Sequence, residues 1–329
     1  MTKMIGENQT RTPETERDFL KRADNLARTA AVELGLPGEY TPFDKVVEWF
    51  QGSDFRWKPS TIRVYRAAIR CALENACKNP DAYEEAGAAL ARLNAEPARP
   101  MPAKGAKRRT SARKRKSASI AEMSEISNVL LQSQHRYARL ASHMLCLGTE
   151  LGLRPTEWST ARLEGTTLVV TNAKATNSRA NGEVRHLELS DLTPNLATMV
   201  KELLAMIEAA LETSTWVKIA AGIRHLCSWA SAKAAIAVPS LRGAKISPYT
   251  TRHIAAARAK VVMDEAGVAA FLGHNSTRTA QSHYARKRTA TGWAPTRVGV
   301  DPSQVKTVRR TYRARGEKLT STSPKPPKI

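Results

Sequence analysis

The sequence predicts a mainly α-helical protein with one small antiparallel β-sheet or hairpin in its second half. Apolar residues recur at helical spacing over much of the chain, and two short β-type runs flank a turn-rich stretch. The chain has 329 residues, of which 42% are hydrophobic, which is enough for two domains with packed cores. We expect a helical first domain over 1–95, a linker over 96–118, a mixed α/β domain over 119–290 and a basic C-terminal tail over 291–329.

The first domain is expected to contain a helix that begins near Ser60, a residue type that favours the N-cap position. Behind it, apolar residues recur every three or four positions, as in Ile62, Tyr65 and Ile69. A stripe of arginines occupies another face of this helix: Arg63, Arg66 and Arg70. A solvated face explains one such stripe, but in so basic a chain contact with DNA phosphates is an equally good interpretation.

The linker at 96–118 combines prolines with a dense basic run and has almost no apolar residues to bury. Its basic side chains suit contact with DNA, although a solubilising tether or a nuclear-localisation-like signal has the same composition. The candidate DNA-binding residues of this run are Lys107, Arg108, Arg109, Arg113 and Lys114.

The charge balance favours a polyanionic partner. Lys plus Arg number 52 and Asp plus Glu 30, giving a formal net charge of +22 and a pI of about 10.2. Nucleic acid is the first choice; an anionic membrane is the weaker one, because no apolar run reaches the ~18 residues of a membrane span. The first eight residues lack an apolar signal core, so we expect a cytoplasmic, nucleoid-associated protein.

The four cysteines form no Cys-x-x-Cys pair and stand beside no histidine cluster: Cys71, Cys77, Cys146 and Cys227. Zinc binding and a disulfide framework are therefore not expected. We predict neither a metal nor another cofactor.

The second domain is expected to begin with a helix capped by Ser119 or Ser124. The next helix should end at Gly152, which suits the position after a helix, and Pro155 should begin another helix. Arg154 would then lie in the turn between two helices, where its side chain can reach into a cleft.

Two β-type runs follow, at 167–171 and 184–189, and the turn-rich stretch between them indicates a hairpin with Lys174 near its first bend. An amphipathic pattern over 195–212 predicts a helix that serves the core.

Four side chains further suggest chemistry on a phosphodiester. Arg154 and Arg252 provide planar donor forks for phosphate oxygens, His274 can share a proton, and Tyr284 can attack phosphorus. Together they could break and rejoin a DNA backbone without a metal ion.

This spaced pattern resembles the catalytic domain of tyrosine recombinases, the family that includes phage integrases. The resemblance covers about residues 119–288, and a weaker one over 40–78 is similar to the family's helical core-binding domain. It implies catalytic roles for six residues, with Glu157 and His253 supporting them: Arg154, Lys174, Tyr249, Arg252, His274 and Tyr284.

The sequence departs from the family pattern at two places. Tyr249 stands where a histidine is usual, three residues before Arg252, and a phenol with a pKa near ~10 is a poorer proton shuttle than imidazole. The step from His274 to Tyr284 is ten residues rather than nine, so His283 could stand where the tyrosine normally lies.

The resemblance implies a site-specific recombinase of a mobile genetic element that cuts and rejoins DNA through a covalent 3′-phosphotyrosine. In it, Lys174 is the candidate general acid for the leaving 5′ hydroxyl. The implied partners are double-stranded DNA with specific sites, a tetramer of the chain, and accessory DNA-bending or directionality proteins. Two alternatives stay open: a catalytically degenerate DNA-binding accessory protein of the same fold, and a type IB topoisomerase-like relaxing enzyme.

Overall fold

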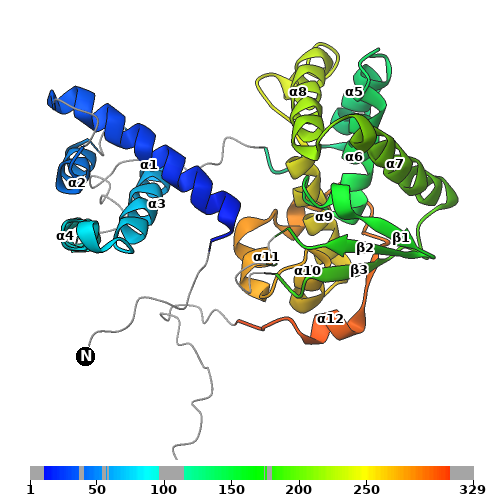
Figure 1. Ribbon diagram of the computed structural model, residues 1–329. Helices are drawn as coiled ribbons and strands as arrows, with labels where there is room; N and C mark the ends of the chain where they lie inside the picture. Colours follow the sequence, from blue (N-terminus) through cyan, green and yellow to red (C-terminus); the bar gives the residue numbers. More distant parts are fainter. Residues whose placement is uncertain are drawn as a thin grey trace, which may run out of the picture. The chain divides into compact units, whose positions relative to one another are not determined.

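The computed structural model describes residues 11–36, 41–53, 57, 59–95, 115–173, 175 and 180–311 (Figure 1). The chain divides into two compact units at the junction between Arg109 and Thr110. Its elements are mostly helices with one small antiparallel sheet, which confirms the predicted fold class.

The N-terminal unit consists of helices α1 (Pro13–Leu34), α2 (Phe43–Gly52), α3 (Pro59–Ala76) and α4 (Tyr83–Ala95), with the 3₁₀ helix η2 (Pro80–Ala82) before α4. The helix expected after Ser60 is α3. Its residues Ile62, Ile69 and Leu73 are buried in a core shared with Phe50 of α2. The predicted periodicity therefore marks the packed face of α3.

The arginine stripe on α3 does not form one solvated face. Arg63 is exposed, but Arg66 is buried and donates to the carbonyl of Leu93, and Arg70 donates to Asn94 Oδ1 at 2.5 Å. The last two arginines thus bind the C-terminal end of α4, where carbonyl groups favour cations. The prediction of a phosphate-contacting stripe is wrong for Arg66, whose guanidinium is committed to the fold.

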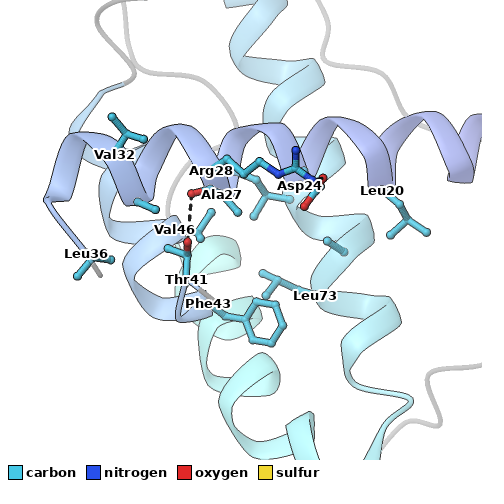
Figure 2. Close-up of a pocket in the computed structure, with 14 residues that line it drawn as sticks. Leu20, Asp24, Ala27, Arg28, Val32, Leu36, Thr41, Phe43, Val46 and Leu73 are labelled. Carbon is cyan, nitrogen blue, oxygen red and sulfur yellow. Dashed lines mark hydrogen bonds and ion pairs between the residues drawn. The ribbon is translucent and has the colours of Figure 1, made fainter. Parts of the chain in front are cut away.

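An apolar pocket of about 810 Å³ lies between α1, α2 and α3 (Figure 2). Leu20, Val46 and Leu73 line it, and its polar contacts include the hydrogen bond from the Thr41 hydroxyl to the Ala27 carbonyl at 3.2 Å. The charged lining residues Asp24 and Arg28 pair with each other, and the four side chains singled out for phosphodiester chemistry all belong to the other unit.

The C-terminal unit contains the helices α5 (Ile120–Leu131), α6 (Ala138–Leu151), α7 (Pro194–Thr213), α8 (Trp216–Ala234), α9 (Pro248–Val262), α10 (Glu265–Phe271), α11 (Thr277–His283) and α12 (Pro302–Lys306). Ser119 caps α5 in a capping box with Glu122, so of the two predicted N-caps, Ser119 and Ser124, the first is the observed one. Helix α6 packs against α5, α7, α8 and α9, which places it at the centre of the unit.

The sheet has four strands in the order β1 (Arg162–Glu164), β2 (Thr167–Thr171), β3 (Val184–Glu188) and β4 (Gly299–Val300), and each neighbouring pair is antiparallel. The two predicted β-runs form the central hairpin, with Leu168 paired to Leu187 and both buried. The sheet therefore turns one apolar face into the core of this unit.

The limits predicted for the linker and the tail need correction at their inner ends. Arg115 pairs with the buried Glu122 at 2.5 Å and Ala118 is buried, so the C-terminal unit begins before residue 119. At the other end, β4 extends the sheet and α12 packs against α10, so the fold continues beyond residue 290.

The helix expected at Pro155 is instead a turn followed by the 3₁₀ helix η3 (Trp158–Thr160). Among the described helices, none is both long and apolar enough to cross a membrane.

Candidate active site

Arg154 lies in the turn that follows α6. Gly152 ends the helix with φ +63°, and a Cβ there would approach the Phe271 ring to 3.0 Å, so the chain requires glycine at this turn. The Trp216 indole donates to the Pro155 carbonyl at 3.0 Å and fixes the chain beyond Arg154. The arginine is held by this turn with only 7% of its surface exposed.

Helix α9 carries Tyr249, Arg252 and His253 in its first two turns, after a capping box formed by Ser247 and Thr250. Arg252 is fully buried. It donates to the carbonyls of Gly152 and Leu272, the latter at 2.6 Å, which joins the turn after α6 to the end of α10. Burial lowers the pKa of Arg252 to about 10, so the side chain remains a cation at neutral pH.

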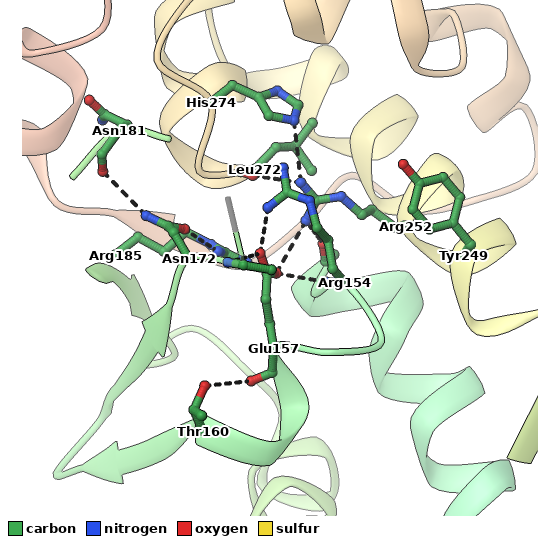
Figure 3. A network of polar contacts seen from close by, with 12 residues as sticks. Arg154, Glu157, Thr160, Asn172, Asn181, Arg185, Tyr249, Arg252, Leu272 and His274 are labelled. Atoms are coloured by element: carbon green, nitrogen blue, oxygen red, sulfur yellow. Dashed lines mark hydrogen bonds and ion pairs between the residues drawn. The ribbon is translucent and has the colours of Figure 1, made fainter. Parts of the chain in front are cut away.

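Glu157 is the centre of the polar network (Figure 3). Its carboxylate accepts from the Arg154 backbone N–H at 2.7 Å and from the Arg154 guanidinium, and it lies 3.6 Å from Arg252 Nη1. Burial alone would raise the pKa of this carboxyl, but the charges of the surrounding guanidinium groups, Arg185 first, hold it well below its usual range. Glu157 therefore stays ionised and holds the Arg154 guanidinium in place.

Arg185 belongs to this network but was not predicted from the sequence, and the same holds for its partner Asn172. It lies on β3 with 1% of its surface exposed, and Nη2 donates to Glu157 at 2.7 Å while Nη1 donates to Asn172 Oδ1 at 2.5 Å. A signal was present, because Arg185 is in phase with the buried Leu187 on an alternating strand. A charge at an apolar position of a strand indicates a buried partner.

His274 follows the turn at Gly273, which has φ +64°. A Cβ on Gly273 would overlap Asn172 Oδ1 and lie 3.0 Å from Arg185 Nη1, which explains the glycine before the histidine. His274 Nε2 lies 3.3 Å from Arg252 Nη2; because arginine only donates, Nε2 accepts and the neutral ring carries its proton on Nδ1.

The His274 imidazole is held neutral. Burial, reinforced by the charge of Arg252, lowers its pKa to about 2. Nδ1 is buried and has no hydrogen-bond partner among the described residues. It is therefore an unused donor beside two cations.

Tyr284 follows directly after α11 in an extended conformation, with φ −105° and ψ 162°, and is 7% exposed. Its hydroxyl accepts from Arg252 Nε at 2.9 Å, and the Tyr249 hydroxyl lies 3.4 Å away. Helix α11 ends at His283, whose side chain is exposed, and the chain is extended at Tyr284. The step of ten residues from His274 therefore still brings the phenol of Tyr284 to Arg252.

The phenol of Tyr284 lies in an unusual electrostatic setting. Burial raises its pKa, but the charge of Arg252 and hydrogen bonds from Arg252 and Tyr249 outweigh this effect, so the pKa lies below its ordinary value. Burial and the Tyr284 phenol raise the pKa of Tyr249 to about 12. Of the two phenols, Tyr284 is the one poised to ionise.

His253 packs its ring against Tyr284, with centroids 5.1 Å apart, and His274 does the same from another segment at 5.1 Å. Burial, then the charge of Lys116, lowers the pKa of His253 to about 4. Two neutral imidazoles thus pack against the phenol ring of Tyr284.

Helix α11 is held from both sides. Lys260, in the last turn of α9, donates to the carbonyls of Ala280 and Ala285 at 2.9 Å each, on either side of Tyr284. At the start of α11, Thr277 donates its N–H to Arg309, which lies next to α12. The position of Tyr284 therefore depends on α9 and on the C-terminal segment.

Lys174 and the predicted linker contacts lie outside the described residues: Lys107, Arg108, Arg109, Arg113 and Lys114. The chain is described up to Ala173, whose N–H donates to Glu157 at 3.3 Å.

The site carries an excess of positive charge. Arg154, Arg185 and Arg252 contribute three cations and Glu157 one anion, and both imidazoles are neutral, which leaves a charge of +2. Arg154 Nε and Nη2 have no acceptor among the described residues. No cluster of three His, Cys, Asp or Glu side chains that could hold a metal ion occurs in the described part of the chain. An anion beside Tyr284 would balance this charge.

Comparison with known proteins finds similarity only among solved structures, since no protein-family model and no curated protein matches the chain. The similar structures are those of tyrosine recombinases. A lambda integrase dimer bound to a COC′ core site has a TM-score of 0.47 at 13% identity, covering 87% of this chain and 91% of that chain.

XerH site-specific recombinase bound to palindromic difH substrate has a TM-score of 0.44 at 13% identity, covering 80% of this chain and 77% of its own. The Tn1549 transposon integrase in complex with a circular intermediate DNA has a TM-score of 0.40 at 10% identity, covering 83% and 95%.

Proposed function

We propose that this chain is a site-specific DNA recombinase of the tyrosine recombinase family, of integrase type. One observation carries the proposal: Tyr284 places its hydroxyl 2.9 Å from Arg252 Nε inside a buried site with a net charge of +2. A phenol that accepts from a buried guanidinium is a nucleophile held beside a phosphate-binding group.

The scissile phosphate would bind between the two arginines. Arg154 offers Nε and Nη2, which have no acceptor among the described residues, and the planar fork matches two phosphate oxygens. His274 offers the Nδ1 proton, which also lacks a partner within the described part of the chain. These donors meet the charge that spreads over the non-bridging oxygens in the transition state.

In the reaction, Tyr284 releases its proton to water and attacks phosphorus as the phenolate. The bond from phosphorus to the 5′ oxygen breaks, and the DNA is left as a 3′-phosphotyrosine. The 5′ oxygen takes a proton, for which Lys174 is the proposed general acid. A second 5′ hydroxyl then attacks the phosphotyrosine and rejoins the strand; the covalent bond stores the energy, so ATP is not required.

Tyr249 would assist the nucleophile rather than shuttle protons to the phosphate. Its hydroxyl lies 3.4 Å from that of Tyr284, and its pKa is raised to about 12, so it is a donor throughout the neutral range. A donor there stabilises the phenolate.

The proposed partner is double-stranded DNA with specific recombination sites, in keeping with the net charge of +22. We further propose that the chain acts as a tetramer on DNA, assisted by accessory bending or directionality proteins. In this proposal the protein is cytoplasmic and recombines the DNA of a mobile genetic element.

The decisive test is a covalent adduct. The purified chain is incubated with nicked duplexes whose core positions are randomised, so that the site is present without being known. Denaturant-resistant adducts are then isolated, sequenced and mapped by mass spectrometry. We expect wild type and Tyr249→Phe to form an adduct on residue 284 and Tyr284→Phe to form none.

The other outcomes separate the alternatives. Tight DNA binding without an adduct would indicate a degenerate accessory protein. An adduct with relaxation of supercoiled plasmid but no strand exchange between two selected sites would indicate a type IB topoisomerase-like enzyme.

A further inference from the structure

Arg185 makes two contacts that lead to two different parts of the site (Figure 3). Nη2 donates to Glu157 at 2.7 Å, and Glu157 in turn orients the Arg154 guanidinium. Nη1 donates to Asn172 Oδ1 at 2.5 Å, at the point where the chain leaves β2. One guanidinium therefore joins the phosphate-binding arginines to the base of the β2–β3 hairpin.

Asn172 closes the base of that hairpin. Its Nδ2 donates to the carbonyls of Asn181 and Gly182 at 3.3 and 3.0 Å, and its own N–H donates to Glu183 at 2.7 Å. The next residue, Ala173, donates its N–H to Glu157. The chain that enters the hairpin loop is thus held at Asn172 by Arg185 and at Ala173 by Glu157.

The pair of Arg185 and Asn172 also fills the space under the turn before His274. A Cβ on Gly273 would overlap Asn172 Oδ1 and lie 3.0 Å from Arg185 Nη1. Both side chains are nearly inaccessible, with 1% and 3% of their surface exposed, so neither can move aside into solvent. Their geometry is therefore fixed by packing as well as by hydrogen bonds.

Stability alone is a poor explanation for this arginine. Glu157 already has Arg154 and Arg252 as partners, and a buried ion pair is seldom more stabilising than an apolar pair of the same shape. Arg185 Nε is moreover buried with no partner among the described residues. What Arg185 supplies is a defined position for the hairpin base relative to the arginine pair.

We propose that Arg185 is a positioning residue that sets the hairpin base against Glu157 and so controls protonation of the leaving 5′ oxygen. Lys174, the proposed general acid, follows Ala173 directly in the sequence, so we expect a shift of the hairpin base to reduce proton donation. This inference rests on the proposed function.

The test compares two leaving groups. One nicked duplex carries the ordinary phosphodiester, and the other carries sulfur in place of the bridging 5′ oxygen. Attack by Tyr284 then breaks a phosphorus–sulfur bond and releases a 5′ thiolate, which is stable without a proton because a thiol is far more acidic than an alcohol. A defect in proton donation vanishes on this substrate, whereas a defect in phosphate binding remains.

We expect Arg185→Gln to slow single-turnover adduct formation on ordinary DNA by about 10²-fold, the lower range of general-acid effects. On the sulfur substrate the rate should return to within a few-fold of wild type, as for Lys174→Ala. Asn172→Ala, which removes no charge from the core, should show the same rescue and guards against misfolding of the Arg185 variant. The matched control is Arg258→Lys, which alters a different buried arginine, one that lies on α9 rather than on β3. This variant should cleave both substrates at the wild-type rate per folded molecule.

An equal loss on both substrates for Arg185→Gln and Asn172→Ala, with Lys174→Ala rescued, would overturn the positioning role alone. Absence of any adduct from wild type on either substrate would instead reject the proposed function.

Discussion

Helix α9 buries one arginine toward each of its ends, Arg252 and Arg258. The two positive charges differ in whether a nearby carboxylate balances them. Arg258, near the C-terminal end, pairs with Glu150 at 2.5 Å, donates to the carbonyl of Ala294 at 2.7 Å and lies over the Trp293 ring at 5.5 Å. Arg252, near the N-terminal end, has its nearest carboxylate, Glu157, at 3.6 Å, and that carboxylate serves two other arginines.

We propose that this difference separates a structural buried charge, Arg258, from one that serves the reaction, Arg252. The Arg258 cation has its own counter-ion, so nothing further is needed to balance it. The Arg252 cation belongs to a group with a surplus charge of +2 and donates to a phenol, Tyr284. Such a surplus is costly unless an anion arrives, and a phosphodiester together with a phenolate would supply two negative charges.

The largest expected effect comes from replacing each arginine by lysine, which keeps the charge but removes the planar fork. Arg252→Lys should lower the single-turnover cleavage rate by about 10²–10³-fold, as for loss of a transition-state donor. Arg258→Lys should lower the free energy of unfolding by a few kcal/mol, since a buried pair is disturbed, while cleavage per folded molecule stays near wild type. Equal losses of cleavage in both variants would contradict the distinction.

Acid should weaken the fold through His274, which lies beside Arg252. Its pKa is lowered to about 2 in the folded chain, so below an unfolded pKa near ~6.5 only the unfolded state takes up the proton. Stability is therefore fully present above ~6.5 and falls as the pH drops, by up to about 1.4 kcal/mol per pH unit. Denaturant titrations from neutral pH to pH ~5 should show this slope reduced in His274→Asn; an unchanged slope would mean that the ring is not held neutral.

A smaller effect is expected from Tyr249→Phe, which removes the donor 3.4 Å from the Tyr284 hydroxyl. Loss of one hydrogen bond to a charged group is worth about 1.5–3 kcal/mol, so cleavage should slow by roughly 10- to 150-fold. The pH–rate profile should also move to higher pH, because the phenolate of Tyr284 loses a stabilising contact. A slower rate with an unshifted profile would assign Tyr249 to the phosphate instead.

The smallest effect concerns α3, where the exposed Arg63 contrasts with the buried Arg66. Arg63→Ala should weaken DNA binding uniformly and reduce the slope of log K against log salt by about 1. Arg66→Ala should lower the stability of the N-terminal unit, because the Leu93 carbonyl loses its donor. Fluorescence anisotropy across a salt series, with thermal unfolding alongside, checks both; an unchanged salt slope in Arg63→Ala would remove α3 from the DNA contacts.

Local signals in the sequence were enough for several elements of the C-terminal unit. The end of α6 and the strands β2 and β3 could be predicted because their signals, a glycine after the helix and two runs of β-type residues, are local in the sequence. Strand β4 was not predictable in this way, since Gly299 pairs with Glu188 more than a hundred residues away. Strand β4 has only two residues, which is too short for a periodic pattern, so it is recognised only by its pairing with β3.

Residue types tied to a spacing singled out Arg154 and Tyr284 in the sequence, and the fold brings both into the network around Arg252. The prediction that Arg66 contacts DNA phosphates was wrong, because an arginine on a helix face has the same sequence pattern whether it faces solvent or binds the end of α4. Arg185 was missed because its partners, Glu157 and Asn172, come together only in the folded chain. Long-range charge pairing leaves little trace in a single sequence.

We propose that Arg252 holds the Tyr284 phenol ready to ionise, and this ionisation can be measured directly. In protein labelled with ¹³C at the phenolic carbon of tyrosine, the Tyr284 resonance is identified as the one lost in Tyr284→Phe and is followed in a pH titration. We predict that Tyr284 titrates below the ordinary phenol value of 10 while Tyr249 titrates well above it. A Tyr284 resonance that titrates at or above 10 would contradict the claim that Arg252 activates it.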